Sequence, residues 1–249
     1  MQEARVAVVR QNPKSEEACP LDCTKPAEFE SRRDERSTIM EWSENIGLGP
    51  QQWYPGGTEL FKQGAPAEYV YFLERGLVKI SHMDPSGLEM IISINATKGS
   101  LMGASCAVLE KHFVTATVLT RTQLRHIPSA QFRSQLNRDV NMSWHIHQMH
   151  CRMLSALIVQ RAQMASLSVR QRLEQLLWRL ITTMELKREN GEVRLPLPLK
   201  YWEIAQLVMV TPEHLSRVVS ALEREGLLIK EKSGTLVFPD PDKLWHGAT

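Results

Sequence analysis

The sequence predicts an α+β chain in which a small antiparallel β-roll precedes a long helix and a C-terminal pair of helices with a β-hairpin. Three observations predict this order. Short β-rich runs separated by turn residues fill residues 53–127, and heptad-spaced apolar residues cover 140–165. Two short helical segments and a hairpin pattern then follow between residues 200 and 238.

Composition narrows the class of protein. Four scattered cysteines are too few for a disulfide scaffold. Charges throughout the first 20 residues exclude a signal peptide or membrane anchor there, and no later stretch is long and uncharged enough to span a bilayer. We therefore expect a cytoplasmic protein with no membrane partner. The net charge is only +2, so an argument for DNA binding must rest on local pattern.

The chain divides into four predicted regions. The first, residues 1–45, is a flexible tail interrupted by prolines, with a short helix near Ser37. The others are a sensory β-roll over 46–136, a dimerisation helix over 137–166 and a winged helix-turn-helix domain over 167–249.

The roll is predicted from short strands with regular turns between them. The β-rich runs are 69–73, 77–80, 90–94, 114–119 and 123–127. Glycine-containing turns separate them, which is typical of a small antiparallel roll or barrel.

The long helix carries two apolar stripes at heptad spacing. One stripe comprises Val140, Trp144, His147, Cys151, Leu154 and Ile158. The other comprises Met142, Ile146, Met149, Met153 and Ala156. Two stripes indicate two partners, so we expect one to pack on the roll and the other on a second copy in a parallel coiled coil. The alternative is a helix buried within a monomer.

A helix-turn-helix is predicted after a break at residues 166–168 and another at 195–198. Ser168 can cap a helix over 169–180, and residues 200–207 form a short helix followed by a turn at 208–210. In the next helix, Thr211 is the N-cap, Pro212 the first residue and Gly226 the stop.

The second helix of this pair has the chemistry of a DNA-reading element. Its inner face is apolar, whereas Glu213, Ser216, Arg217 and Ser220 lie on the outer side. Arginine can bond guanine O6 and N7, and glutamate can accept from cytosine N4. Runs at 227–230 and 235–238, joined by a turn, add a hairpin wing. The candidate reading residues are Thr211, Glu213, His214, Ser216, Arg217 and Ser220.

From residue 53 to 238 the sequence resembles the CRP/FNR family of bacterial transcription regulators. The matching segments are 54–64 (YPGGTELFKQG), 71–80 (YFLERGLVKI), 211–217 (TPEHLSR) and 222–227 (LEREGL). The resemblance implies a cupin-like, cyclic-nucleotide-binding-type roll, a homodimer and a winged helix-turn-helix. Glu213, Ser216 and Arg217 resemble the FNR-type motif, which implies a palindrome with TTGAT-like half-sites. Met209 stands where the family usually has glycine, and a positive φ there would strain methionine.

The family's cyclic-AMP site is altered in this sequence. The matching stretches are Gly103-Ala104-Ser105 and Val114-Thr115, which lack the family's carboxylate and phosphate-binding arginine. Because burying a phosphate without a cation or N–H partner is costly, we expect an effector other than cyclic AMP.

Redox sensing is a second possibility. Redox relatives hold an iron–sulfur cluster through N-terminal cysteines and one roll cysteine, whose position is occupied here by Arg125. The candidate redox residues are Cys19, Cys23, Cys106 and Cys151. Three interpretations remain open: an iron–sulfur cluster, a Cys19–Cys23 thiol switch, or small core residues with incidental tail thiols.

The histidines of the long helix raise the question of a metal. His147 and Cys151 are four residues apart on one face, which is ligand-like spacing, with His145 and His150 nearby. Both also lie on an apolar stripe, where a packed histidine is the commoner outcome. We therefore predict no metal site.

Together these features predict a sequence-specific transcription regulator that is not an enzyme. Its expected partners are double-stranded DNA, a second copy, an unknown small-molecule or redox effector and, for an activator, RNA polymerase. The alternative is a cyclic-nucleotide-type ligand-binding module whose DNA binding is lost or vestigial. The exposed Glu213, Ser216 and Arg217 face argues against that alternative.

Overall fold

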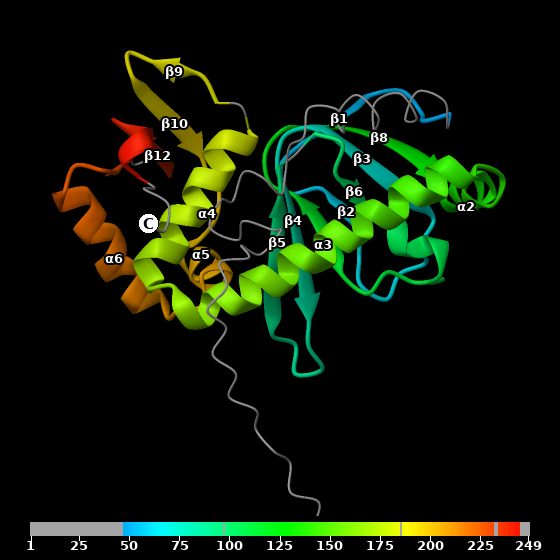
Figure 1. Cartoon of the computed structure of the whole chain (residues 1–249), viewed down its shortest axis with the longest axis horizontal. Coiled ribbons are helices and arrows are strands. Elements are labelled where there is room, and N and C mark those ends of the chain that lie inside the picture. Colours follow the sequence, from blue (N-terminus) through cyan, green and yellow to red (C-terminus); the bar gives the residue numbers. More distant parts are fainter. Residues whose placement is uncertain (1–46, 97, 185, 232–233, 245–249) are drawn as a thin grey trace, which may run out of the picture.

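The computed structural model describes residues 47–244 except positions 97, 185, 232 and 233. The tail predicted over 1–45, its helix near Ser37 and both Cys19 and Cys23 therefore lie outside the described residues. Figure 1 shows the roll at one end of the molecule and the helical C-terminal part at the other, with the long helix α3 running between them. The predicted α+β fold is confirmed.

The roll consists of two four-stranded antiparallel sheets, ordered β1-β8-β3-β6 and β2-β7-β4-β5. The strands are β1 (Gln52–Tyr54), β2 (Glu59–Phe61), β3 (Tyr69–Arg75), β4 (Val78–Met83), β5 (Glu89–Asn95), β6 (Leu101–Met102), β7 (Thr115–Val118) and β8 (Thr122–Pro128). The five predicted runs correspond to β3, β4, β5, β7 and β8. The strands β1, β2 and β6 have only two or three residues, too few to show an alternating pattern in the sequence.

The helices α3 and α4 begin at side-chain caps that the sequence supplies. After η1 (Ala104–Ala107) and α2 (Ser129–Arg138), the long helix α3 (Val140–Ser166) begins where the Asp139 carboxylate accepts a bond from the Met142 N–H at 3.0 Å. Leu167 is extended and ends α3, and Ser168 forms a capping box with Gln171 that begins α4 (Val169–Thr183). The predicted interruption at 166–168 is confirmed.

The C-terminal part contains more strands than the predicted wing. Its elements are β9 (Arg188–Glu189), β10 (Glu192–Pro196), α5 (Tyr201–Leu207), α6 (Pro212–Arg224), β11 (Ile229–Lys230), β12 (Thr235–Phe238) and η2 (Pro241–Lys243). The sheet order is β11-β12-β10-β9, so the predicted hairpin of β11 and β12 is present.

Residues 195–198 interrupt regular structure before α5, as predicted, but Leu195 and Pro196 are also the last two residues of a strand that was not predicted, β10. Val193 and Leu195 point inward and are almost fully buried, while β10 pairs with β12 up to Pro196 opposite Thr235. Proline is tolerated because it is the last residue of the strand, where its missing N–H interrupts no continuing ladder.

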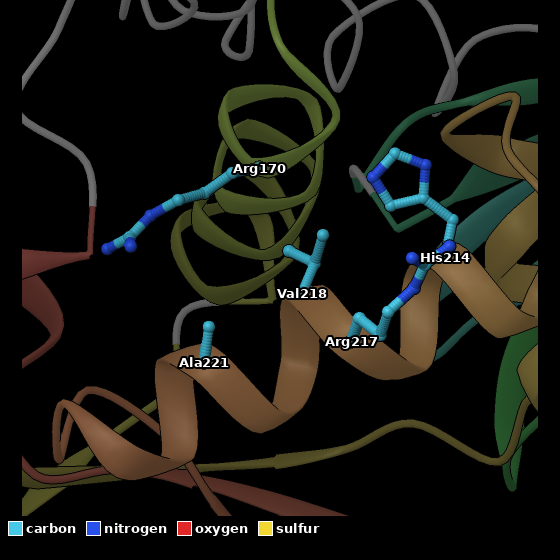
Figure 2. A pocket seen from close by; sticks show the side chains of 5 residues that line it. All are labelled: Arg170, His214, Arg217, Val218 and Ala221. Atoms are coloured by element: carbon cyan, nitrogen blue, oxygen red, sulfur yellow. The ribbon is translucent and has the colours of Figure 1, made fainter.

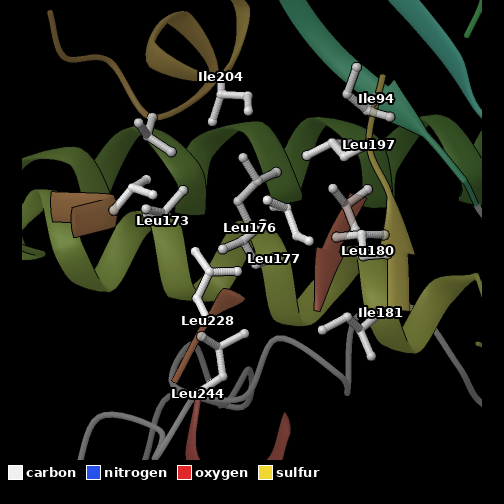
Figure 3. Packing of buried hydrophobic residues seen from close by; sticks show 14 of the residues in the cluster. Ile94, Leu173, Leu176, Leu177, Leu180, Ile181, Leu197, Ile204, Leu228 and Leu244 are labelled. Atoms are coloured by element: carbon white, nitrogen blue, oxygen red, sulfur yellow. The ribbon is translucent and has the colours of Figure 1, made fainter. Parts of the chain in front are cut away.

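One hydrophobic cluster joins the two parts of the molecule. It contains Leu173, Leu177 and Leu180 of α4 together with Ile91 and Ile94 of β5. Figure 3 shows Ile94 beside the C-terminal core residues. Two smaller clusters fill the roll and its contact with α2 and α3. The C-terminal part is thus packed directly against one sheet of the roll.

Candidate nucleic-acid interface

Helix α6 is oriented by its buried face and by its cap. Leu215 and Leu222 are fully buried and Val219 nearly so. The Thr211 hydroxyl accepts a bond from the His214 N–H at 3.3 Å, and Gly226 adopts φ 71° just beyond the C-cap. The helix begins and ends where the sequence predicts, with its opposite face directed to solvent.

That opposite face carries the predicted reading residues. All six are exposed: Thr211, Glu213, His214, Ser216, Arg217 and Ser220. Residues 213, 216, 217 and 220 share one side of a helix by their spacing. The structure therefore brings together donors and acceptors of the kinds that bond base edges in a major groove.

The surroundings of Glu213 favour the ionised form of its carboxyl group. Its own backbone N–H, then the Thr211 hydroxyl and finally the Arg217 guanidinium lower the pKa of its carboxyl group below the ordinary value. The side chain is consequently an acceptor at neutral pH, which is the form that bonds the amino group of cytosine.

A shallow hollow between α4 and α6 is lined by a further cation, Arg170, which was not among the predicted site residues. Figure 2 shows the residues that line it: Arg170, His214, Arg217, Val218 and Ala221. The Arg170 guanidinium bonds both carboxylate oxygens of Glu225 at 2.7 and 2.6 Å, and Glu174 at 2.7 Å. No sequence signal singles out Arg170, because Glu225 lies 55 residues away along the chain.

The turn between α5 and α6 adopts a left-handed conformation at Met209. Met209 has φ 51°, and its side chain is half exposed. A β-carbon in this conformation crowds the following carbonyl, which costs about 1–2 kcal/mol. Met209 therefore strains the turn.

Replacing Met209 by glycine is expected to raise the free energy of unfolding by about 1 kcal/mol, because it removes this strain. Urea unfolding of Met209→Gly and of the matched control Met209→Ala measures the effect. The alanine variant removes the same side chain but keeps the β-carbon, so it should not be more stable than the parent. Equal gains in both variants would show that the side chain, and not the backbone, is the source of strain.

A buried ion cluster holds α5 against the roll. The Lys79 ammonium group of β4 lies 2.9 Å from a Glu203 carboxylate oxygen in α5 and 3.3 Å from Glu89 in β5. The side chains of Lys79 and Glu203 are only 12% and 8% exposed. Burial alone would lower the Lys79 pKa, but the two carboxylates outweigh it and raise that pKa. The ion pair is therefore complete at neutral pH and is lost only above the ordinary range of lysine.

Gln206 adds a two-point backbone contact at the same place. Its side-chain oxygen accepts from the Ile91 N–H at 2.9 Å, and its amide nitrogen donates to the Glu89 carbonyl at 2.9 Å. Because β5 is the edge strand of its sheet, these bonds occupy backbone groups that no neighbouring strand reaches. The first helix of the helix-turn-helix is thus fixed on the roll by charge, hydrogen bonds and apolar packing.

The predicted effector positions lie near a buried histidine. Gly103 has φ 81°, and a β-carbon there would lie 3.2 Å from the His112 ring. The His112 ring stacks on Phe61 at 3.8 Å, is 3% exposed and has no hydrogen-bond partner for Nδ1 among the described residues. Burial lowers its pKa, so the imidazole is neutral.

Most of the remaining predicted effector positions lie in regular secondary structure, in η1 or at the start of β7. Ala104 is buried and Ser105 partly buried in η1. Val114 packs against the roll core, and the Thr115 hydroxyl at the start of β7 accepts from the Gln63 N–H at 3.0 Å. None of these positions supplies a cation.

The cysteines that the structure describes are separate and free. Cys106 is buried in η1, and burial raises the pKa of its thiol, whereas Cys151 is exposed on α3. The interpretation of Cys106 and Cys151 as small core residues therefore holds for Cys106. It is wrong for Cys151, which is exposed in the single chain. Arg125, at the position of the redox relatives' roll cysteine, donates to the carbonyls of Gly49 and Leu48 at 3.1 and 3.4 Å.

The two stripes of α3 differ in burial. Met142 and Ile146 are buried on the roll and Met149 packs partly against it, but Met153 is 57% exposed. The other stripe is open to solvent: Val140, Trp144, His147, Cys151, Leu154 and Ile158. The helix is therefore not buried within a monomer, and the expected roll contact is confirmed only for the first half of the second stripe.

Over the residues described, no helix is long and apolar enough to cross a membrane. Within that same part of one chain, no group of three or more His, Cys, Asp or Glu side chains is placed to hold a metal ion.

Two family models match the two parts of the chain. The model for a cyclic nucleotide-binding domain matches residues 51–139, and that for a Crp-like helix-turn-helix domain matches residues 171–246. The cAMP-activated global transcriptional regulator CRP of Pasteurella multocida is 26% identical over 74% of this chain and 88% of its own length. The chain belongs to the CRP/FNR family. It is a transcription regulator with a cyclic-nucleotide-binding-type domain and a DNA-binding helix-turn-helix domain.

Solved CRP/FNR structures share the fold. FixK2 from Bradyrhizobium japonicum superposes with a TM-score of 0.61 at 20% identity, covering 78% of this chain and 94% of its own. A transcriptional regulator of the CRP/FNR family from Thermus thermophilus, TTHA1359, gives a TM-score of 0.64 at 20% identity, covering 78% and 96%. At 20% identity, these similarities show only that the fold is shared.

Proposed function

We propose that this CRP/FNR-family regulator binds, as a homodimer, a palindrome with TTGAT-like half-sites through α6. The observation that carries the proposal is the exposed Glu213, Ser216 and Arg217 face of a capped helix. Arg217 would bond a guanine through O6 and N7, and the ionised Glu213 would accept from a cytosine amino group. The half-site sequence rests on the resemblance of these residues to the FNR-type motif.

The exposed stripe of α3 supports the dimer. Trp144, Leu154 and Ile158 are each more than half exposed, at the spacing of a two-stranded parallel coiled coil. Burying this stripe against a second copy would place two α6 helices on one side of the dimer. Each would read one half of a palindrome, about one helical turn or 34 Å apart.

The residues at the predicted effector positions of the roll favour an effector other than cyclic AMP. Gly103, Ala104, Ser105, Val114 and Thr115 offer neither a carboxylate for a ribose nor an arginine for a phosphate. The neighbouring His112 is neutral, so it would not compensate a buried phosphate charge. The input would instead be another small molecule or a change at the thiols.

Regulation would act through the orientation of the DNA-reading helices. The chain between α3 and α4 is extended at Leu167, which offers a hinge between the long helix and the C-terminal part. An input that favoured one orientation would shift the population toward dimers whose α6 helices match successive major grooves.

Fluorescence anisotropy tests the proposal with a labelled duplex containing TTGAT and the inverted repeat ATCAA, and with a scrambled control. Anaerobic protein, air-exposed protein and protein with cyclic AMP are compared. We expect the palindrome to bind at least about 1000-fold more tightly than the scrambled duplex in one of the redox states, with no change on adding cyclic AMP. Equal affinity for both duplexes under every condition would contradict the proposed recognition.

A further inference from the structure

A pair of potential metal ligands lies on the exposed stripe of α3. His147 Nε2 and Cys151 Sγ are 3.6 Å apart, and both residues are exposed. The His147 ring lies against the Trp144 ring, with centroids 5.7 Å apart and planes inclined at 30°. The imidazole is thus already oriented, with Nε2 directed at the thiol one helical turn along.

The proposed dimer would double this pair. Along the stripe, Trp144, His147, Cys151, Leu154 and Ile158 follow each other at intervals of three and four residues. In a parallel two-stranded coiled coil, such core positions meet the same residue of the other chain across the axis. His147 and Cys151 would therefore face the partner's His147 and the partner's Cys151 in adjacent layers.

We propose that the dimer binds one Zn²⁺ ion between the two α3 helices, through Cys151 Sγ and His147 Nε2 of both chains. The site rests on the proposed dimer. Zn–S and Zn–N bonds of about 2.3 and 2.0–2.1 Å at tetrahedral angles separate sulfur from nitrogen by about 3.6 Å. This is the separation already present within one chain. Two thiolates and two imidazoles form the tetrahedral ligand set typical of zinc, and the two thiol protons leave to solvent on binding.

The composition of the stripe supports a ligand at this level. Dimerisation would bury four polar groups on the axis, and polar groups buried without partners are costly. Leu154 and Ile158 in the following layers are apolar, so the polar groups are confined to the two adjacent layers of His147 and Cys151. A metal ion on the axis satisfies all four groups at once.

Cobalt(II) serves as a spectroscopic probe for the site. Full-length protein is reduced, freed of metal with a chelator and titrated with Co²⁺ alone. We expect visible bands of tetrahedral cobalt and a thiolate-to-cobalt charge-transfer band that saturate at one ion per two chains. Zinc then displaces the cobalt. With zinc at about a hundred times its Kd, the dissociation constant of the dimer in sedimentation should fall about a hundredfold.

Variants assign the ligands. The charge-transfer band should vanish in Cys151→Ser and weaken or shift in His147→Gln. It should persist in His145→Gln, whose ring already bonds the Asn141 carbonyl at 2.7 Å, and in the double variant Cys19→Ser/Cys23→Ser. Persistence of the band in Cys151→Ser, or saturation at one ion per chain, would overturn the assignment.

The proposed function is tested separately, by measuring binding of the protein to the palindromic duplex. A dimer that binds the palindrome but takes up no cobalt overturns the zinc site alone. A monomer that neither binds cobalt at this stoichiometry nor prefers the palindrome overturns both.

Discussion

Replacing Arg217 by alanine is expected to abolish the preference for the palindrome while leaving weak, salt-sensitive binding to any duplex. Arg217 is exposed on the outer face of α6, so the fold should be unaffected. One bidentate contact to guanine contributes about 1–3 kcal/mol of discrimination. Two half-sites double this to about 2–6 kcal/mol, which corresponds to a loss of about 30-fold to 20 000-fold in specific affinity.

The matched control is Arg224→Ala on the last turn of the same helix. Arg224 donates to the Ser220 carbonyl at 3.2 Å and carries the same charge. Its loss should weaken binding to both duplexes similarly and leave the ratio of affinities unchanged. Anisotropy titrations at two salt concentrations measure both quantities. Unchanged discrimination in Arg217→Ala would rule out the assigned reading role.

The reading helix was predictable from sequence because its signals are local. Thr211, Pro212 and Gly226 mark its ends, and the 3.6-residue period of Leu215, Val219 and Leu222 separates its two faces. Each signal acts within one or two turns of the chain. The turn at 208–210 was also predictable, whereas the positive φ of Met209 was indicated only by the resemblance, since methionine rarely adopts it.

Features that depend on distant contacts were not predictable. Pro196 looks like a breaker in the sequence, yet β10 forms because Val193 and Leu195 are buried and Thr235 pairs with its last residue. The regular heptad pattern likewise gives no sign that the roll stops supporting α3 after Met149. In both cases tertiary packing, and not local preference, decides the outcome.

The contact between the two parts of the molecule is the largest such feature. Lys79 and Glu203 are 124 residues apart, and each looks in the sequence like an ordinary surface charge. Their pairing also explains the position of α5, because Glu203 accepts the Lys200 N–H at 2.8 Å with its second oxygen. One carboxylate thus caps the helix and fixes it to β4.

Replacing Lys79 by methionine is expected to lower the free energy of unfolding by about 3–5 kcal/mol, because Glu203 is left as a buried charge without its cation. Because one hydrophobic cluster joins the roll to the C-terminal part, we expect a single unfolding transition for the parent chain. In Lys79→Met the C-terminal part should loosen from β5 first, so the transition should split in two. Urea unfolding followed by circular dichroism and by tryptophan fluorescence measures both effects.

A second substitution separates the charge from the cap. Glu203→Gln retains an oxygen for the Lys200 N–H and removes the charge, so the double variant Lys79→Met/Glu203→Gln should recover part of the lost stability. Lys98→Met is the matched control: Lys98 is 53% exposed and lies 3.7 Å from Glu74, a pair that contributes at most about 1 kcal/mol. Equal losses in Lys79→Met and Lys98→Met would contradict the role of the buried cluster. A double variant no more stable than Lys79→Met would instead show that the lysine acts through packing, because removing the stranded charge would then restore nothing.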